Sequence, residues 1–263
     1  MVLIIGLNLP LTTRGLKLMD TGAALINDRG IIMAIAQERV TREKHGGGIK
    51  ESINYLLKAN KLKLNEIDYF VVSICCDIPP TKDYVIRILA DEGIKIKKNK
   101  IIINESHHMS HAATAYYTSG FDEALIYIAD GEGNILNPIE FEFHANSIER
   151  TTYYIGKGNK IKLISRDADE PGDLGQGMCY GYFTQWIGYP NYQSSGKTMG
   201  LAPYGNKKRF EKVKIFYLNK DKIYSYLEPN ITRTLSVRRL IFKQTGKEIG
   251  INSLESTKNP SQL

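Results

Sequence analysis

Three of the five histidines in this chain fall within five consecutive positions, at the start of the segment HHMSHAATAYY (residues 107–117). His107 and His111 are four residues apart, so on a helix their side chains lie one turn apart on the same face and can reach one metal ion. His108 points roughly 100° away and is the less suitable ligand. The pair alone is also compatible with an ordinary polar helix face.

A carboxylate follows the histidines at the end of an apolar run. The segment ALIYIAD ends at Asp130, and Gly131 and Gly133 come next. Asp130 can supply a hard oxygen ligand, and the glycines allow backbone amides to approach phosphate oxygens closely. A simple Asp-Gly turn would have the same composition. Two imidazoles and one carboxylate suit Fe(II), Zn or Mn, and ligand type does not choose among these metals.

A third group of reactive side chains lies in QERVTREKHGGG (residues 37–48). Arg39 and Arg42 can clamp a phosphate or carbamoyl oxyanion, and His45 can transfer protons. A charged, solvated loop would look similar in composition.

The segment SSGKTMGLAPYGN (residues 194–206) contains SGKT, which is part of the phosphate-binding P-loop motif. That motif also requires a glycine five residues before Gly196, where this chain has Asn191. A P-loop is therefore excluded.

The elements that must position these residues alternate between strands and helices. Three strand-like runs (2–8, 23–27 and 31–37) are followed by a helical pattern, a strand (69–75), a second helix, a short strand (101–104) and the histidine helix. The first turn of the histidine helix thus follows the carboxyl end of a buried strand, where α/β proteins place ligands.

From residue 124 the series of elements begins again, with strands followed by a helix that has one apolar face. Repetition of this kind is typical of duplicated ribonuclease-H-like lobes in actin-like α/β folds; an unrelated β-rich second domain is the alternative. We expect a first lobe at residues 1–123 with the histidine helix at 106–118, an incomplete second lobe at 124–250, and a tail at 251–263 with the composition of disorder.

The composition is that of a soluble globular protein, with 42% apolar and 24% charged residues. Three cysteines offer no disulfide framework, which favours the cytoplasm. No run approaches the ~20 apolar residues that a membrane helix needs. The net charge of +7 is spread along the chain and favours an anionic small molecule over nucleic acid.

A resemblance to a known family rests on four segments in order: AQERVTREKH, NESHHMSHAATAYY, IADGEGN and GKTMGLAPYGN. Together they resemble the N-terminal half of the O-carbamoyltransferase family associated with nodulation factors and with aminoglycoside and cephalosporin antibiotics. Members join lobes similar to the tRNA threonylcarbamoyl-transferring protein to a C-terminal domain that makes carbamoyl-adenylate from carbamoyl phosphate and ATP. The carbamoyl group then passes to a hydroxyl.

The resemblance implies a metal held by His107, His111 and Asp130, with Fe(II) expected, and ATP or carbamoyl-adenylate as the nucleotide. The candidates for nucleotide binding are Gly131, Glu132, Gly133, Asn134, Gly196 and Lys197. The candidates for catalysis are Asp20, Arg39, Arg42, Lys44 and His45. One departure is Met19, which stands where the family has a histidine and cannot transfer a proton.

These observations lead us to expect metal-dependent carbamoyl transfer from carbamoyl phosphate or carbamoyl-adenylate to a hydroxyl of a small metabolite. Because the second lobe is incomplete, we expect one part of a larger or split enzyme, with a protein partner or a C-terminal domain that forms carbamoyl-adenylate. Two alternatives remain: a non-catalytic nucleotide-binding regulatory or scaffold subunit, which Met19 favours, and threonylcarbamoyl transfer to tRNA.

Overall fold

The computed structural model describes residues 1–9, 20–74, 81–104, 106–131, 133–136, 147–168, 175–206, 208, 211, 213–219, 222–227 and 233–245. The chain divides into two compact units, Met1–Gly120 and Phe121–Leu263, which are described separately below. Met19, Glu132 and the tail at 251–263 lie outside the described residues. None of the described helices has the length and apolar composition needed to cross a bilayer.

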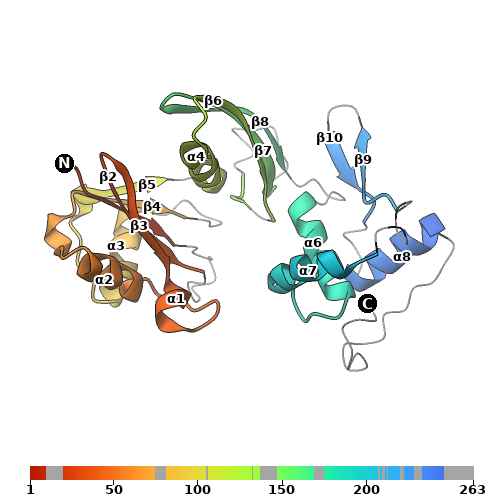
Figure 1. The fold of residues 1–263 in the computed structure, drawn as a ribbon, viewed down its shortest axis with the longest axis horizontal. Helices are drawn as coiled ribbons and strands as arrows, with labels where there is room; N and C mark the ends of the chain where they lie inside the picture. Colours follow the sequence, from red (N-terminus) through yellow and green to blue (C-terminus); the bar gives the residue numbers. More distant parts are fainter. Residues whose placement is uncertain are drawn as a thin grey trace. The chain divides into compact units, whose positions relative to one another are not determined.

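Unit 1 is built on a five-stranded sheet with the strand order β3-β2-β1-β4-β5 (Figure 1). Its strands are β1 (Ile4–Asn8), β2 (Gly22–Asn27), β3 (Gly30–Ala36), β4 (Tyr69–Ser73) and β5 (Ile101–Asn104). The first three are antiparallel neighbours, whereas β4 runs parallel to β1, and β5 parallel to β4. This is the arrangement of a ribonuclease-H-like lobe, and it confirms the predicted α/β class.

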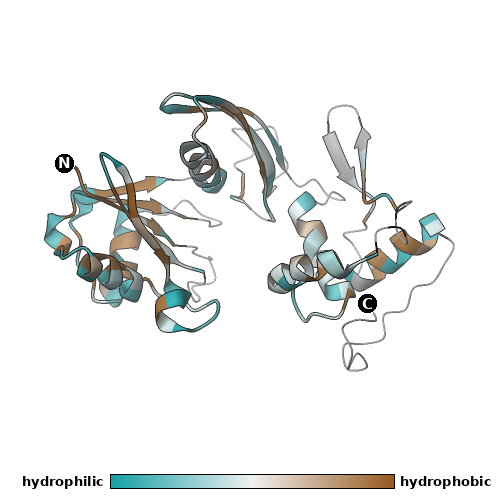
Figure 2. Ribbon diagram, viewed as in Figure 1, coloured by the Kyte–Doolittle hydropathy of each residue, from teal (hydrophilic) through white to brown (hydrophobic). Residues whose placement is uncertain are grey.

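The core of unit 1 lies between this sheet and the helices α2 (Lys50–Ala59) and α3 (Lys82–Asp91). The inward side chains of α2 recur at helical spacing, and Ile53 and Leu56 are completely buried. They belong to one cluster with Ile5 of β1 and Phe70 of β4. Figure 2 shows the apolar residues along the strands of this unit. Short helices complete it: α1 (Gln37–Thr41), η1 (Leu64–Glu66) and η2 (Lys98–Lys100).

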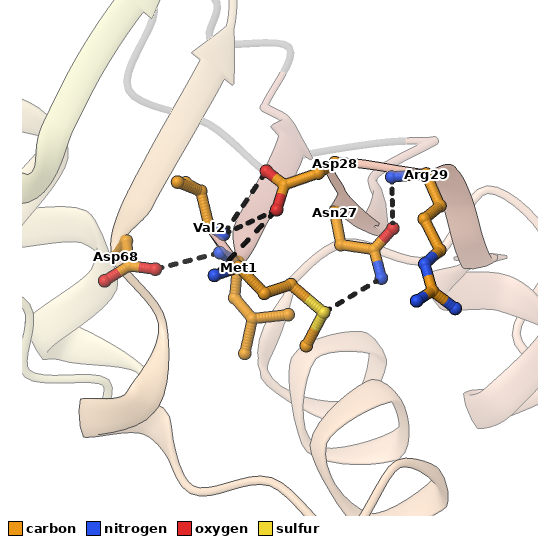
Figure 3. Close-up of polar contacts among 7 residues, drawn as sticks. Met1, Val2, Asn27, Asp28, Arg29 and Asp68 are labelled. Carbon is orange, nitrogen blue, oxygen red and sulfur yellow. Dashed lines mark hydrogen bonds and ion pairs between the residues drawn. The ribbon is translucent and has the colours of Figure 1, made fainter.

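The start of β1 is tied to two neighbouring turns by carboxylates (Figure 3). The backbone amide of Val2 donates to both oxygens of Asp28 at 3.3 Å, and the amide of Leu3 donates to Asp68 Oδ2 at 2.8 Å. Asp28 belongs to the turn between β2 and β3, and Asp68 immediately precedes β4. The first strand is therefore fixed against both of its sheet neighbours.

Unit 2 contains an antiparallel meander with the order β6-β7-β8, formed by β6 (Glu123–Ala129), β7 (Glu149–Lys157) and β8 (Lys160–Ala168). Among the described residues no strand pairs with the other edge of β6. A two-stranded sheet follows later in the chain, made of β9 (Phe216–Asn219) and β10 (Lys222–Ser225). In its described part, the second unit therefore has the antiparallel strands of a lobe without the parallel ones.

The second core lies between α6 (Gln176–Trp186) and α8 (Arg233–Thr245). Met178 and Tyr182 of α6 pack in one cluster with Val237 and Ile241 of α8. Between these helices in the chain come η3 (Tyr192–Ser194), α7 (Ser195–Leu201) and η4 (Ala202–Tyr204). The helix expected after the second set of strands is thus present as α6.

Candidate functional site

The histidine-bearing helix α4 spans His107–Ser119 and follows β5 directly. The hydroxyl of Ser106 caps its first turn by accepting a hydrogen bond from the Met109 amide at 3.1 Å. Gly120 ends it in the left-handed conformation, with φ of 78°. The sequence therefore carries both a start and a stop signal for this helix.

A polar network fastens α4 to the sheet. The hydroxyl of Ser110 lies 2.6 Å from that of Ser73 on β4 and accepts a hydrogen bond from the Asn104 side chain of β5 at 2.7 Å. Ala112 and His108 are completely buried. Because Ser110 is held at the sheet, the rotation of α4 about its own axis is fixed.

His107 and His111 converge at their Nε2 atoms, which are 3.0 Å apart, with the rings nearly perpendicular at 87°. Two nitrogens at about 2.1 Å from one zinc-sized ion, at a tetrahedral angle, would be about 3.4 Å apart. The observed separation is close to that value and is also that of a hydrogen bond between two neutral imidazoles. The pair fits a shared divalent ion after a small movement of either ring.

Both histidines line a cavity of about 700 Å³ that lies within unit 1. Its other wall is the sheet face opposite the core, where the side chains are small, including Gly6, Ala24 and Ala34. Small side chains leave room for a ligand, and the volume falls within the range of about 300–1,000 Å³ for small-molecule sites. Polar groups on the wall are supplied by Asn8, Asp20, Ser73, Asn104 and Ser110.

Two of the predicted catalytic residues, Asp20 and His45, are direct partners. Asp20 Oδ1 lies 2.8 Å from His45 Nδ1, and the backbone amide of His45 donates to Glu38 Oε2 at 3.3 Å. Asp20 and His45 both have φ of 56°, in the left-handed region that L-residues seldom adopt. Asp20 also lines the cavity.

The three basic residues of the same segment, Arg39, Arg42 and Lys44, are exposed and lie outside the cavity lining. Arg39 is 72% exposed and pairs with Glu38 Oε1 at 3.2 Å. Arg42 forms the left-handed cap of α1, and both Arg42 and Lys44 are exposed. None of the three is among the described residues that line the cavity.

The loop after β6 in unit 2 is held by its own hydrogen bonds. The carboxylate of Asp130 accepts the Gly131 amide at 2.6 Å, and the Gly133 amide donates to the carbonyl of Glu149 at 2.8 Å. The guanidinium of Arg150 donates to the Gly131 carbonyl. In this conformation, both glycine amides are therefore bonded within the protein.

This loop lies directly against the first turn of α6. A Cβ atom added to Gly177 would approach the carbonyl carbon and oxygen of Asp130 to 2.5 Å, which is closer than packed atoms allow. Glycine at position 177 is thus required by the path of the loop. No sequence pattern indicates this contact, because Gly177 lies far from Asp130 in the chain.

A buried ion pair, which no sequence pattern indicates, supports the strand that carries Arg150. Glu149, only 1% exposed, lies 3.0 Å from Arg166 Nε and accepts the hydroxyl of Thr152 at 3.1 Å. Burial raises the pKa of Tyr127 and of Tyr153 above the usual tyrosine value.

Gly196 and Lys197 lie on α7, which follows the short helix η3, whereas the helix of a P-loop follows a strand. Both residues are exposed, and Lys197 Nζ lies 5.3 Å from the centre of the Tyr189 ring. The hydroxyls of Thr184 and Thr198 are 2.7 Å apart and join α7 to α6. Residues 198–205 of this segment instead help to line an apolar cavity of about 530 Å³ in unit 2, together with side chains of α6.

Comparisons with known proteins agree with the four sequence segments. Nodulation protein NolNO of Sinorhizobium fredii is 28% identical over 268 residues, which cover 90% of this chain and 36% of that protein. An uncharacterized protein, sll1178 of Synechocystis, is 28% identical over 222 residues, which cover 72% of this chain and 34% of that protein. The chain thus spans about a third of the length of the curated relatives it matches.

Among solved structures, YeaZ from Pseudomonas aeruginosa is similar over 65% of this chain and 69% of its own, with a TM-score of 0.36 and 12% identity. The family model described as "Carbamoyltransferase N-terminus" matches residues 13–78 and 80–249. Because this match covers most of the sequence, the chain belongs to the carbamoyltransferase N-terminal family.

Proposed function

We propose that this chain is the acceptor-side part of a metal-dependent carbamoyltransferase, which moves a carbamoyl group from carbamoyl phosphate or carbamoyl-adenylate to a hydroxyl of a small metabolite. The observation that carries the proposal is the convergence of His107 and His111 on the wall of a 700 Å³ cavity, in a chain of this family. The polar groups on the cavity wall suit a hydroxylated ligand, because they can both donate and accept hydrogen bonds.

The metal would be held by His107 and His111, and we include Asp130 as the third ligand. Fe(II) is the expected ion by resemblance, and Zn or Mn would accept the same ligands. A bound ion supplies Lewis-acid polarisation of a carbonyl or phosphoryl oxygen. The chain's own contribution is orientation, because the bonds of Ser110 to Ser73 and Asn104 hold the face of α4 that carries both histidines.

A donor-forming domain is part of this proposal, since the curated relatives are almost three times as long as the matched region. We expect that domain, joined or separate, to make carbamoyl-adenylate from carbamoyl phosphate and ATP. The loop with Gly131, Gly133 and Asn134 is the proposed nucleotide contact. Nucleotide binding there would require the amides of both glycines to exchange their present partners, Asp130 and Glu149.

The test combines metal content with turnover. His107→Ala and His111→Ala should each weaken iron or zinc binding at the α4 site by at least about tenfold, because a lost ligand weakens a three-ligand site strongly. Tyr117→Ala is the matched control, since Tyr117 is an exposed residue of the same helix. Full metal content in the double histidine variant would contradict the proposed site.

Turnover is measured with radiolabelled carbamoyl phosphate, ATP and a panel of hydroxylated metabolites, after addition of the C-terminal region of a longer family member. Metal-dependent label in an acceptor is the expected result. Nucleotide binding without turnover would favour the regulatory or scaffold alternative, which the presence of Met19 in place of the family's histidine also favours. Salt-sensitive tRNA binding would favour the threonylcarbamoyl alternative.

A further inference from the structure

We propose that Asp20, Glu38 and His45 form a second divalent-cation site in unit 1, separate from the histidines of α4. Each residue offers one ligand atom, and the three atoms lie within 4.8 Å of one another. This site goes beyond carbamoyl transfer and does not depend on it. In it, His45 serves as a metal ligand and not as a proton carrier.

The Asp20–His45 distance is close to that of two ligands of one ion. Asp20 Oδ1 and His45 Nδ1 are 2.8 Å apart. Two ligands at about 2.1 Å from a metal are about 3.0 Å apart at a right angle and about 3.4 Å apart at a tetrahedral angle. Insertion of an ion therefore requires the Asp20–His45 pair to open by a few tenths of an ångström. The Glu38 oxygen, which lies within 4.8 Å of the other two ligand atoms, would have to approach them by up to about 1.4 Å.

The backbone already holds the three segments together. The carbonyl of Asp20 accepts the Asn8 side chain at 3.0 Å, and the carbonyl of Thr21 accepts the Gln37 amide at 2.9 Å. The second bond joins the start of β2 to the first turn of α1, which carries Glu38. The approach of Asp20 to Glu38 is thus fixed by the sheet and the helix and costs little additional ordering.

The elements next to the site are anchored by side-chain hydrogen bonds. Gln37 is 1% exposed, and its side-chain oxygen accepts both the amide and the hydroxyl of Ser52, at 2.9 and 2.8 Å. Downstream of His45, the carboxylate of Glu92 accepts the amides of Ile49 and Lys50 at 2.7 and 2.8 Å. Both ends of the loop that carries His45 are therefore fixed to α2 and α3.

The charge of the cluster favours a divalent ion. Two carboxylates and one neutral imidazole carry two negative charges, which a divalent cation would balance. The guanidinium of Arg39 offsets the negative charge of Glu38, but the Arg39 side chain is 72% exposed and can turn to solvent when an ion binds. One nitrogen and two oxygens suit Zn, Mn or Fe(II) better than Mg or Ca, which prefer oxygen ligands alone.

An ion bound to Asp20 would be accessible from the cavity. Asp20 lines the 700 Å³ cavity, so an ion bound to it would border the same space that His107 and His111 border. Open coordination positions of the ion would then face an anionic or hydroxylated molecule in that cavity. Of the three proposed ligands, Asp20 is the one among the described lining residues of this cavity, whose walls are mainly the sheet face and α4.

The test uses the full chain with His107→Ala and His111→Ala combined, so that the α4 histidines cannot contribute. Equilibrium dialysis against Co(II) and Zn(II), with visible absorption of bound Co(II), should show one ion per chain. In this background, Asp20→Asn and His45→Ala should each weaken binding by at least about tenfold. Glu43→Gln is the matched control, because Glu43 is an exposed carboxylate of the same loop.

Absence of a bound ion in the double histidine background would overturn this proposal, as would unchanged affinity in Asp20→Asn and His45→Ala. Glu38→Gln, which keeps the shape of the side chain, serves as the further variant if either substitution unfolds unit 1 by circular dichroism. If no ion binds at the α4 histidines but one binds at Asp20, the proposed function fails and this second site stands. If an ion binds at the α4 histidines but none at Asp20, this second site fails and the proposed function stands.

Discussion

The first strands of the two units, β1 and β6, begin the same three-stranded antiparallel arrangement but have different neighbours. β1 pairs with β2 on one side and with β4 on the other, whereas β6 pairs with β7 and, among the described residues, with no strand on its second edge. Leu7 of β1 is 2% exposed, whereas Leu125 of β6 is 69% exposed. The same kind of strand is thus central in one unit and at an edge in the other.

This difference shows where each unit gets its stability. The apolar run ALIYIA of β6 is typical of a strand buried on both faces, and apolar edge strands favour pairing with another chain. Unit 1 relies on a continuous core beneath a completed sheet. The meander of unit 2 depends more on local anchors, such as the approach of Gly177 to Asp130 and the buried pair of Glu149 with Arg166.

The largest contrast is expected between Leu56→Ala in unit 1 and Leu125→Ala in unit 2. Leu56 is completely buried, so truncation should lower the free energy of unfolding by about 2–5 kcal/mol. Leu125 is largely exposed, and its truncation should change this free energy by no more than about 0.5 kcal/mol. Urea unfolding followed by circular dichroism measures both. A large loss at Leu125 would mean that the face of β6 that carries this side chain is covered in solution.

Much of unit 1 was predictable, because its elements follow local patterns. The strands show apolar runs, the inward residues of α2 fall at helical spacing, and the four-residue spacing of His107 and His111 placed both on one face of α4. These features depend on the period of the backbone alone, which is the same wherever the segment lies in the fold.

Pairings across distant segments could not be predicted in the same way. Asp20 and His45 meet because a hydrogen bond joins the start of β2 to α1, and nothing in the sequence reveals that bond. The glycines after Asp130 were predicted to present amides to phosphate, but in the structure these amides bond to Asp130 and Glu149. The position of β7 against the loop decides the bond of Gly133 to Glu149, which is a tertiary contact, whereas the bond of Gly131 to Asp130 is local.

The second contrast compares two helical glycines of unit 2. Alanine in a helix is normally favoured over glycine by about 0.5–1 kcal/mol. Gly196→Ala should raise the free energy of unfolding by about this amount, because a methyl group there meets no described atom within 4 Å. Gly177→Ala should instead lower the free energy of unfolding by about 1–3 kcal/mol, because the methyl group meets the Asp130 backbone at 2.5 Å. Thermal unfolding measures both, and equal gains would show that the loop after β6 does not lie against α6.

The smallest contrast concerns the serines that begin α4 and α7. Ser106 caps α4 through the Met109 amide, so Ser106→Ala should lower the free energy of unfolding by about 1 kcal/mol. Ser194 precedes α7 without a cap bond from its side chain to a described amide of that helix; its hydroxyl donates to Asn191 instead, at 3.2 Å. Ser194→Ala should therefore cost only a few tenths of a kcal/mol.

Amide hydrogen exchange resolves this contrast helix by helix. Ser106→Ala should raise exchange at the first turn of α4, where the capped amide lies, and leave Tyr116 near its far end protected. Because that first turn carries His107, with His111 one turn later, the same variant should weaken metal binding by α4, but less than removal of either imidazole does. If both serine variants raised exchange equally, the Ser106 hydroxyl would contribute no more to α4 than the Ser194 hydroxyl does to α7, and the orientation of the histidines would rest on Ser110 alone.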